Sequence, residues 1–303
     1  MKQPSFTLVQ LRYFAAAAEH SSMTSAAREL VVSQSAVSTA IAQLEKELGV
    51  QLLLRHHARG LALTAAGREF YAELRGFLLH SQELANSATD SGQALVGALS
   101  VGCLETLAPF RLPALVAEFG RAHPDVRVTV VEGEHAELKR SLRAGECELA
   151  LMYGYDLEAD LEPVKIGVAA PHVLVHSGHR LARRKRVRLA DLADEPMVLL
   201  DLPHTADYFR SLFAGVGVEP QIRHRSRGFE TVRAMVAAGH GYAVLNQRPA
   251  SDETYGGGSV VCLELQDELA PLDIVVARVR EHRLTRKAEA FMRTCLSSTS
   301  AST

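Results

Sequence analysis

The sequence contains few of the features that mark a secreted, membrane-embedded or disulfide-linked protein. Its four cysteines lie far apart and form no CxxC pair, which argues against a disulfide framework and a zinc site. No segment approaches the roughly 18 apolar residues that span a bilayer, and the N-terminus lacks the continuous apolar segment of a signal peptide. We therefore expect a cytoplasmic protein with no membrane partner, whose cysteines are mostly small apolar fillers.

Signatures of catalysis are also scarce. The chain contains no HExxH, GxSxG or Walker sequence. His172, His176 and His179 are closely spaced, but they cross a predicted strand and turn, so metal ligation is a poor interpretation. A redox role would depend on Cys103, for which a buried filler is the simpler explanation. We expect no enzyme activity, no cofactor and no metal.

The length and charge of the chain favour several domains and a local basic surface. With 303 residues, the chain exceeds what one hydrophobic core usually holds. The formal net charge of -2 argues against a protein that coats nucleic acid without specificity. Between Glu47 and Glu69, however, there is no acidic residue, and Arg55, Arg59 and Arg68 fall inside that window. A solvated loop is the simplest interpretation of this charge run taken alone.

The first 63 residues have the pattern of short helices with tight connections. Thr7 and Gln10 have the spacing of a capping box at the start of a first helix, and a second helix is predicted over 24–30. Ser33 is the predicted N-cap of a third helix, which ends at Gly49. The apolar stripe of the third helix is Val37, Ile41, Leu44 and Leu48. Only Val31 and Val32 separate the second helix from Ser33, and two helices joined by so short a turn form a helix-turn-helix.

The opposite face of the third helix is polar and contains no acid before Glu45. Short hydrogen-bonding side chains of this kind can read base edges in the major groove or bind phosphates. The hairpin pattern over 52–63, with its basic tip, is well placed to contact the DNA backbone beside that helix. The candidate DNA-binding residues are Ser33, Gln34, Ser35, Ser38, Thr39, Gln43, Arg55 and Arg59.

A long helix is predicted from Thr64 to about residue 92. Its apolar stripe, which includes Phe70, Leu74, Leu78 and Ala85, needs a partner surface. We expect self-association through this stripe. Packing onto the effector domain of the same chain is the alternative.

Several segments resemble LysR-type transcriptional regulators. The N-terminal segments are LRYF (11–14), AARELVVSQSAVS (26–38) and IAQLEKELGV (41–50), and LTAAG (63–67) resembles the start of their linker helix. LRAGECELAL (142–151) and VAAGHGYAVL (236–245) are similar to landmarks of their effector domain. The chain departs from the pattern at Ser35, where proline is common, and over 39–42, which lacks a basic residue.

The resemblance implies a multidomain fold. It comprises an all-α winged helix-turn-helix DNA-binding domain (1–63), a linker and dimerisation helix (64–92), and an α/β effector-binding domain (93–303) similar to periplasmic binding proteins. Subdomain I would hold 95–167 plus 270–303, and subdomain II 168–269. The implied function is transcription regulation. The implied partners are double-stranded DNA, a small-molecule effector and further copies of the chain, as dimers and tetramers.

From Leu95 onward, strand patterns alternate with helical ones, which predicts mainly parallel sheets. The predicted strands are 98–102, 126–131, 149–152, 173–176, 197–200, 221–225, 242–245 and 272–279. A last helix is predicted from Thr285 to about Leu296, and the Ser/Thr-rich stretch 297–303 is predicted to be disordered.

Ligands of parallel sheets sit beyond the carboxyl ends of strands, near helix N-termini. The candidate effector-binding residues at such positions are Cys103, Glu105, Thr106, Asp201, His204, Thr205, Phe229, Thr231 and Asn246. Acidic and basic residues occur together there, so the charge of the effector is left open. The threonines could also be simple N-caps.

Two classes of function remain. The favoured one is a ligand-responsive DNA-binding regulator. The alternative is a small-molecule-binding or enzymatic α/β protein whose helical N-terminus only mediates assembly. The polar face over 34–43, followed by the basic hairpin, favours the first.

Overall fold

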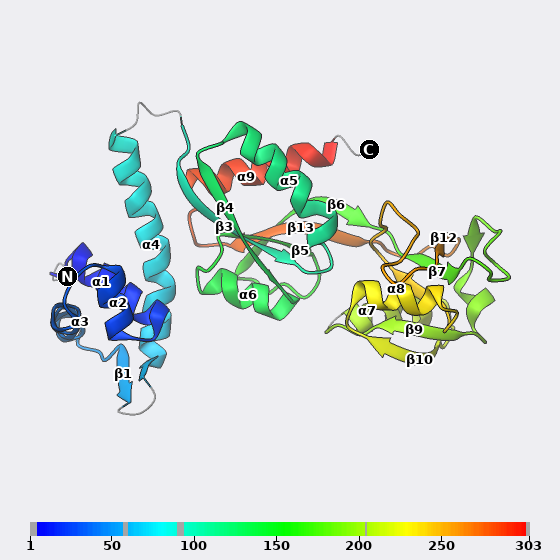
Figure 1. Ribbon diagram of the computed structural model, residues 1–303, viewed down its shortest axis with the longest axis horizontal. Helices are drawn as coiled ribbons and strands as arrows, with labels where there is room; N and C mark the ends of the chain where they lie inside the picture. The colour runs from blue at the N-terminus through cyan, green and yellow to red at the C-terminus, as the bar shows by residue number, and fades with distance from the viewer. Residues whose placement is uncertain (1–4, 57–59, 90–93, 204, 301–303) are drawn as a thin grey trace.

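The computed structural model describes residues 5–56, 60–89, 94–203 and 205–300. Figure 1 shows a helical N-terminal body, one long helix and two α/β bodies arranged in a row. Each of the three bodies has its own cluster of buried apolar side chains. Within the described ranges, none of the helices combines the length and apolarity that crossing a bilayer requires.

Local capping signals set the limits of the N-terminal elements. Its elements are α1 (Leu8–His20), α2 (Met23–Glu29), α3 (Gln34–Leu48), β1 (Leu53–His56) and β2 (Gly60–Leu63). The predicted capping box is confirmed, because the Gln10 amide donates to Thr7 Oγ1 over 3.2 Å and the Thr7 amide donates to Gln10 Oε1 over 2.7 Å. The Ser33 hydroxyl accepts the Ala36 amide at 3.1 Å, and Gly49 ends α3 with a φ of 69°. Both boundaries of α3 therefore agree with the prediction.

The long helix α4 (Ala65–Thr89) packs along the N-terminal body, and this corrects the prediction for its apolar stripe. Leu74 is only 4% exposed, inside the core that contains Phe14 and Ile41. Phe70 contacts Phe14 with ring centroids 5.6 Å apart. Phe70, Leu74 and Leu78 thus pack on the N-terminal body of the same chain while Ala85 is exposed, so a dimer interface centred on Leu74 is wrong.

Subdomain I, the α/β body next to α4, is built on a five-stranded mixed sheet of order β4-β3-β5-β13-β6. Its strands are β3 (Gly97–Leu104), β4 (Val126–Gly133), β5 (Leu149–Tyr153), β6 (Leu161–Ala169) and β13 (Leu272–Val279). Its helices are α5 (Ala108–Ala122), α6 (His135–Arg143) and α9 (Arg286–Ser300). Figure 1 shows α5 and α9 on one side of this sheet and α6 on the other. Phe119 of α5 and Phe291 of α9 meet edge to face at 5.2 Å.

Subdomain II is the second α/β body and contains a four-stranded sheet of order β11-β7-β12-β8 and a parallel pair of β9 and β10. Its strands are β7 (His172–His176), β8 (Arg186–Val187), β9 (Pro196–Leu200), β10 (Gln221–Ser226), β11 (Ala243–Leu245) and β12 (Val260–Leu265). Its helices are α7 (Thr205–Gly215), α8 (Phe229–Ala237) and the 3-10 helix η1 (Leu189–Leu192). At Gly241, whose φ is 141°, a Cβ would lie 2.1 Å from the Pro196 carbonyl oxygen, so this approach of two backbones requires glycine.

The expectation of mainly parallel sheets is wrong. Strand β13 runs antiparallel to both β5 and β6, and β7 runs antiparallel to both β11 and β12. Strands β6, β8 and β12 were not predicted. The sequence of β6, LEPVKIGVA, contains a proline that masks it, and β6 is an edge strand, where proline is tolerated.

The predicted disorder from residue 297 is also corrected, because α9 continues to Ser300. The buried side chains of Phe291 and Cys295 hold this helix on subdomain I.

Candidate nucleic-acid interface and effector cavity

Helix α3 turns a polar face to solvent while its apolar stripe holds it in place. Val37, Ile41 and Leu44 are fully buried beneath it. The side chains of Gln34, Ser35, Thr39 and Gln43 are exposed, and Ser38 is half-buried. Every predicted DNA-binding residue of this helix therefore lies at or near one accessible surface.

Some of these polar side chains already form hydrogen bonds within the protein, and others do not. The Ser33 hydroxyl caps the helix and contacts the Ser35 hydroxyl at 3.0 Å. Gln10 donates to the side-chain oxygen of Gln43 at 3.3 Å. Within the described residues, the side chains of Gln34 and Thr39 have no hydrogen-bond partner. Gln34 and Thr39 are thus the residues of α3 most available to a ligand.

The predicted wing is present as the antiparallel pair β1–β2, with Leu53 opposite Leu63 and His56 opposite Gly60. One oxygen of Glu45, on α3, accepts the amides of Leu52 and Leu53 at 2.7 and 3.0 Å. This carboxylate fixes the hairpin to the C-terminal end of α3, a role that the sequence did not reveal. Arg59 lies outside the described residues, and only the backbone of Arg55 is described.

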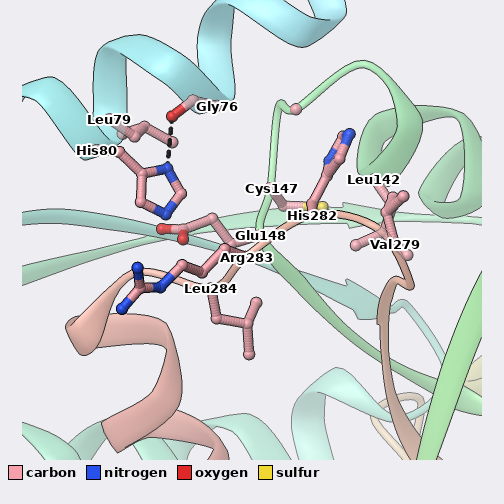
Figure 2. A pocket seen from close by; sticks show the side chains of 11 residues that line it. Gly76, Leu79, His80, Leu142, Cys147, Glu148, Val279, His282, Arg283 and Leu284 are labelled. Atoms are coloured by element: carbon pink, nitrogen blue, oxygen red, sulfur yellow. Dashed lines mark hydrogen bonds between the residues drawn. The ribbon is translucent and has the colours of Figure 1, made fainter.

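A polar junction joins α4 to subdomain I around a small cavity of about 30 Å³, shown in Figure 2. His80 donates through Nδ1 to the Gly76 carbonyl oxygen of its own helix at 2.8 Å. Glu148, which faces His80 from the other side, accepts the amide and hydroxyl of Thr285 at 3.1 and 3.0 Å. These residues are distant in the sequence, so no local pattern could have identified the junction.

The main candidate for an effector site is a cavity of about 380 Å³ between the two subdomains. This volume is within the usual range for small-molecule sites. The turn from β3 into α5 forms the first wall, with Glu105, Thr106, Pro109 and Phe110. Helix α8 and the loop that follows β11 form the second, with Phe229, Glu230, Arg233, Pro249, Ala250, Ser251, Glu253 and Tyr255.

Of the predicted effector residues, Glu105, Thr106 and Phe229 line this cavity together. Phe229 meets Phe110 across the gap, with ring centroids 5.3 Å apart and planes at 72°. Thr106 is 8% exposed and hydrogen-bonds the Tyr153 hydroxyl beneath the cavity. The structure therefore brings three of the nine predicted effector residues, from both subdomains, to one cavity.

The other predicted effector residues lie elsewhere. Asp201 lines a separate surface hollow with Arg227 and pairs with Arg225 at 3.4 Å. Thr231 is exposed but is not among the residues lining the cavity, and His204 lies outside the described residues.

Asn246 and Thr205 belong to contacts that link the two subdomains. Asn246 donates at 2.9 Å to the carbonyl oxygen of Ala169, the last residue of β6 in the sheet of subdomain I, and at 3.1 Å to the hydroxyl of Tyr208 within subdomain II. Thr205 is buried and hydrogen-bonds the Tyr155 hydroxyl.

Further contacts bridge the two halves directly. Gln247 donates to the Tyr153 hydroxyl at 3.2 Å, and burial raises the pKa of that hydroxyl to about 12, which keeps it protonated. Arg227 of subdomain II forms an ion pair with Glu134 of subdomain I. Movement between the halves would have to break or rearrange these contacts.

Cys103 is a buried filler and is not part of the cavity wall. Its thiol donates to the Leu104 carbonyl oxygen at 3.7 Å, and burial raises its pKa to about 12. Burial raises the pKa of Cys147 and Cys295 to about 12 in the same way. Since the thiolate is the reactive form, these three thiols are poor nucleophiles.

The fold combines a helix-turn-helix domain with a separate α/β domain, and comparison with known proteins shows that this is the architecture of a class of transcription regulators. Residues 8–68 match the bacterial regulatory helix-turn-helix protein family of the lysR type, and residues 92–300 match the LysR substrate binding domain. The chain belongs to the LysR family of transcriptional regulators and is a regulator, not an enzyme.

Similar proteins span most of the chain. The hydrogen peroxide-inducible genes activator of Dickeya chrysanthemi is 31% identical over 237 residues, which cover 78% of this chain and 77% of that protein. The regulator TfdS of Cupriavidus pinatubonensis is 30% identical over 91% of this chain and 93% of its own length. The crystal structure of HinK, a LysR family regulator from Pseudomonas aeruginosa, is 36% identical with a TM-score of 0.66, and the match covers 97% of this chain and 99% of HinK.

Proposed function

We propose that this chain is a sequence-specific DNA-binding regulator, controlled by a small molecule that binds between subdomains I and II. The proposed limits are 1–63 for the DNA-binding domain, 64–92 for the linker helix and 93–303 for the effector domain. Within the effector domain, 95–167 and 270–303 form subdomain I and 168–269 form subdomain II, except that β6 carries the sheet of subdomain I on to Ala169. The observation that carries the proposal is a cavity walled from both subdomains in a chain that also presents an exposed polar helix face. Action on DNA places the protein in the cytoplasm.

On DNA, Gln34, Ser38 and Thr39 face the major groove, and the wing arginines Arg55 and Arg59 contact phosphates. A gel shift with a duplex from the upstream region of its own gene tests sequence preference. We expect tighter binding to this duplex than to a scrambled one, and loss of that preference in Gln34→Ala/Thr39→Ala. Equal binding of both duplexes by the unaltered protein would reject sequence-specific recognition.

The wing has its own test. Arg59→Ala should weaken binding to every duplex alike, because one phosphate contact is lost. The slope of the logarithm of the binding constant against the logarithm of the salt concentration should become less steep by about one. Arg121→Ala, which removes an exposed arginine of α5, is the matched control and should change neither quantity. An unchanged slope in Arg59→Ala would remove the wing from the interface.

Two copies associate through α4, whose side chains Phe77 and Leu84 are 54% and 73% exposed, and effector domains pair these dimers into tetramers. Phe77→Glu/Leu84→Glu should reduce the mass measured by sedimentation, because an apolar interface does not tolerate two charges. Val50→Glu, at an exposed apolar residue of the N-terminal body, is the control. An unchanged mass in the double variant would exclude this face of α4.

Ligand binding reaches the DNA through the junction of α4 with subdomain I. A ligand that prefers one arrangement of the two subdomains shifts the population toward it, and subdomain I transmits the change to α4 around His80 and Glu148. Because the two copies associate through α4, a change in the position of α4 alters the distance between the two α3 helices of the dimer. That distance sets the spacing of the paired half-sites that the two helices read.

A further inference from the structure

We infer that the cavity between the subdomains binds a cationic ligand, an amine attached to an aromatic or similarly flat apolar ring. This inference rests on the proposed function, because it names the chemical class of the effector at the same site. It follows from the charges on the cavity wall, from how each charge is used, and from the aromatic side chains between them.

The charged side chains of the wall are predominantly acidic. Glu105, Glu230 and Glu253 contribute carboxylates, and Arg233 contributes the one guanidinium among the described lining residues. Glu105 and Glu253 are exposed and have no ion-pair partner within the described chain. The cavity therefore has an excess of negative charge that the described residues do not balance.

Arg233 cannot offset this charge, because its guanidinium is already engaged. It is 3% exposed, and Nη1 donates to Glu230 at 2.6 Å. Nη2 donates to the carbonyl oxygens of Ser251 and Glu253 at 2.7 and 3.2 Å. Arg233 thus ties the loop after β11 to α8 and neutralises Glu230, which leaves Glu105 and Glu253 as the free charges.

Two further arginines near predicted strand ends, Arg227 and Arg248, are not among the residues that line this cavity. Arg227 pairs with Glu134 and lines the separate hollow beside Asp201. Arg248 is exposed, and its charge acts on the neighbouring His172 and Cys262. An anionic ligand would therefore meet two uncompensated carboxylates and no available cation among the described lining residues.

The uncharged part of the wall is aromatic and apolar. Phe110 and Phe229 form an edge-to-face pair across the gap, so a ring or an ammonium group can lie against an aromatic face. Tyr255 stands at the rim with 93% of its surface exposed, and Glu230 accepts its backbone amide at 2.9 Å. A flat ligand would cover aromatic surface that is otherwise exposed to water.

The same arrangement gives the ligand a regulatory effect. Glu105 belongs to subdomain I and Glu253 to subdomain II, so their like charges oppose closure of the cavity. A cation between them removes this repulsion and favours the closed arrangement. A neutral ring of the same shape lacks this differential effect, and a ligand indifferent to both states shifts nothing.

Isothermal titration of the full-length protein with three matched probes tests the charge. We expect 2-phenylethylamine to bind at least about tenfold more tightly than 2-phenylethanol, and 3-phenylpropanoate to bind most weakly, a tenfold ratio being about 1.4 kcal/mol. Equal or tighter binding of the alcohol or the acid would overturn the inference. So would an absence of amine binding at millimolar concentration.

Substitutions assign the effect to the two carboxylates. Glu105→Gln and Glu253→Gln should each weaken amine binding by about fivefold, as expected for a partly exposed ion pair, and leave binding of the alcohol unchanged. Glu219→Gln, at an exposed glutamate outside the cavity, is the matched control and should have no effect. If both cavity variants bind the amine like the unaltered protein, the carboxylates do not recognise it.

These titrations contain no DNA, so they separate the two proposals. Sequence preference in the gel shift without amine selectivity would overturn the ligand class alone. Amine selectivity without sequence preference would support the ligand class and remove the regulatory function.

Discussion

The recognition helix and the effector cavity use their polar side chains in opposite ways. On α3, structural tasks fall to residues outside the centre of the exposed face: Ser33 caps the helix and Glu45 holds the wing. Gln34 and Thr39 are left without internal partners. In the cavity, Arg233 both lines the site and fastens its wall. Binding and stability should therefore be separable in the DNA-binding domain and coupled in the effector domain.

The largest expected difference is between Arg233→Ala and Gln34→Ala. Arg233→Ala removes a buried guanidinium from Glu230 and from two backbone carbonyls, and losing one partner of such a pair costs about 3–5 kcal/mol. Gln34→Ala changes an exposed side chain and should alter the free energy of unfolding by less than about 0.5 kcal/mol. Urea unfolding measures both. Similar costs for the two variants would remove the distinction between the two regions.

A second comparison is possible within α4, which carries two glycines. A Cβ at Gly67 would lie 2.0 Å from the Leu52 carbonyl oxygen, where the helix meets the wing, whereas a Cβ at Gly76 would meet no atom within 4 Å. Gly67→Ala should destabilise the N-terminal body by about 3 kcal/mol, the upper end for overpacking, because backbone atoms must move. Gly76→Ala should raise the free energy of unfolding by up to about 1 kcal/mol through helix propensity.

Circular dichroism during urea unfolding, with a gel shift at matched concentration, follows both glycine variants. A Gly67→Ala protein as stable as the unaltered chain would show that the wing is free to move away from α4. The hairpin would then not be held in a fixed position against α4, as we propose for the DNA-binding surface.

The N-terminal body could be predicted almost residue by residue because its signals are local. The capping box at Thr7, the cap at Ser33 and the end at Gly49 each depend on residues within one helical turn. The partner of the α4 stripe could not be predicted in the same way. Periodicity shows that Leu74 lies on an apolar face, but it does not show what covers that face.

The effector domain was predicted less completely because its sheets pair distant segments. Strand β13 enters between β5 and β6 from the far end of the chain, and no local pattern reports this antiparallel insertion. The predicted strand ends placed Glu105, Thr106 and Phe229 at the cavity, but its other lining residues, among them Phe110, Arg233 and Glu253, were not predicted. Phe110 and Arg233 lie inside helices, where the sequence alone makes them look like ordinary helical positions, and Glu253 lies in the loop after β11, which has no pattern that marks a site.

His172 offers a test of desolvation in the effector domain. Burial lowers the pKa of its imidazole to about 4, and the positive charge of Arg248 acts in the same direction. The unfolded chain therefore binds this proton more readily, with a pKa of about 6.5. Stability is retained above the unfolded pKa and falls as the pH drops from about 6.5 toward 4. Between pH 7.5 and pH 5 the expected loss is about 2 kcal/mol.

Urea unfolding at the two pH values checks this expectation. His172→Gln should lose about 2 kcal/mol less than the unaltered protein over the same interval. His240→Gln, which replaces an exposed histidine of the same subdomain, should behave like the unaltered protein. An identical pH dependence for His172→Gln would show that the imidazole is solvated.

The smallest expected effect is a stabilisation, and it concerns the turn between α2 and α3. Val31 adopts a φ of 55°, a left-handed conformation that a β-branched residue rarely takes, and its side chain is 89% exposed. That conformation costs an L-residue about 1–2 kcal/mol, and almost no packing compensates for it here. Val31→Gly should therefore raise the free energy of unfolding by up to about 1 kcal/mol, because glycine removes the strain but loses more chain entropy on folding. Val50→Gly is the matched control: Val50 is exposed with an ordinary φ, so the same change should destabilise the domain. If urea unfolding shows both substitutions to be equally destabilising, the backbone at Val31 is not strained. The turn between α2 and α3 would then form without the cost in free energy that a φ of 55° implies for valine.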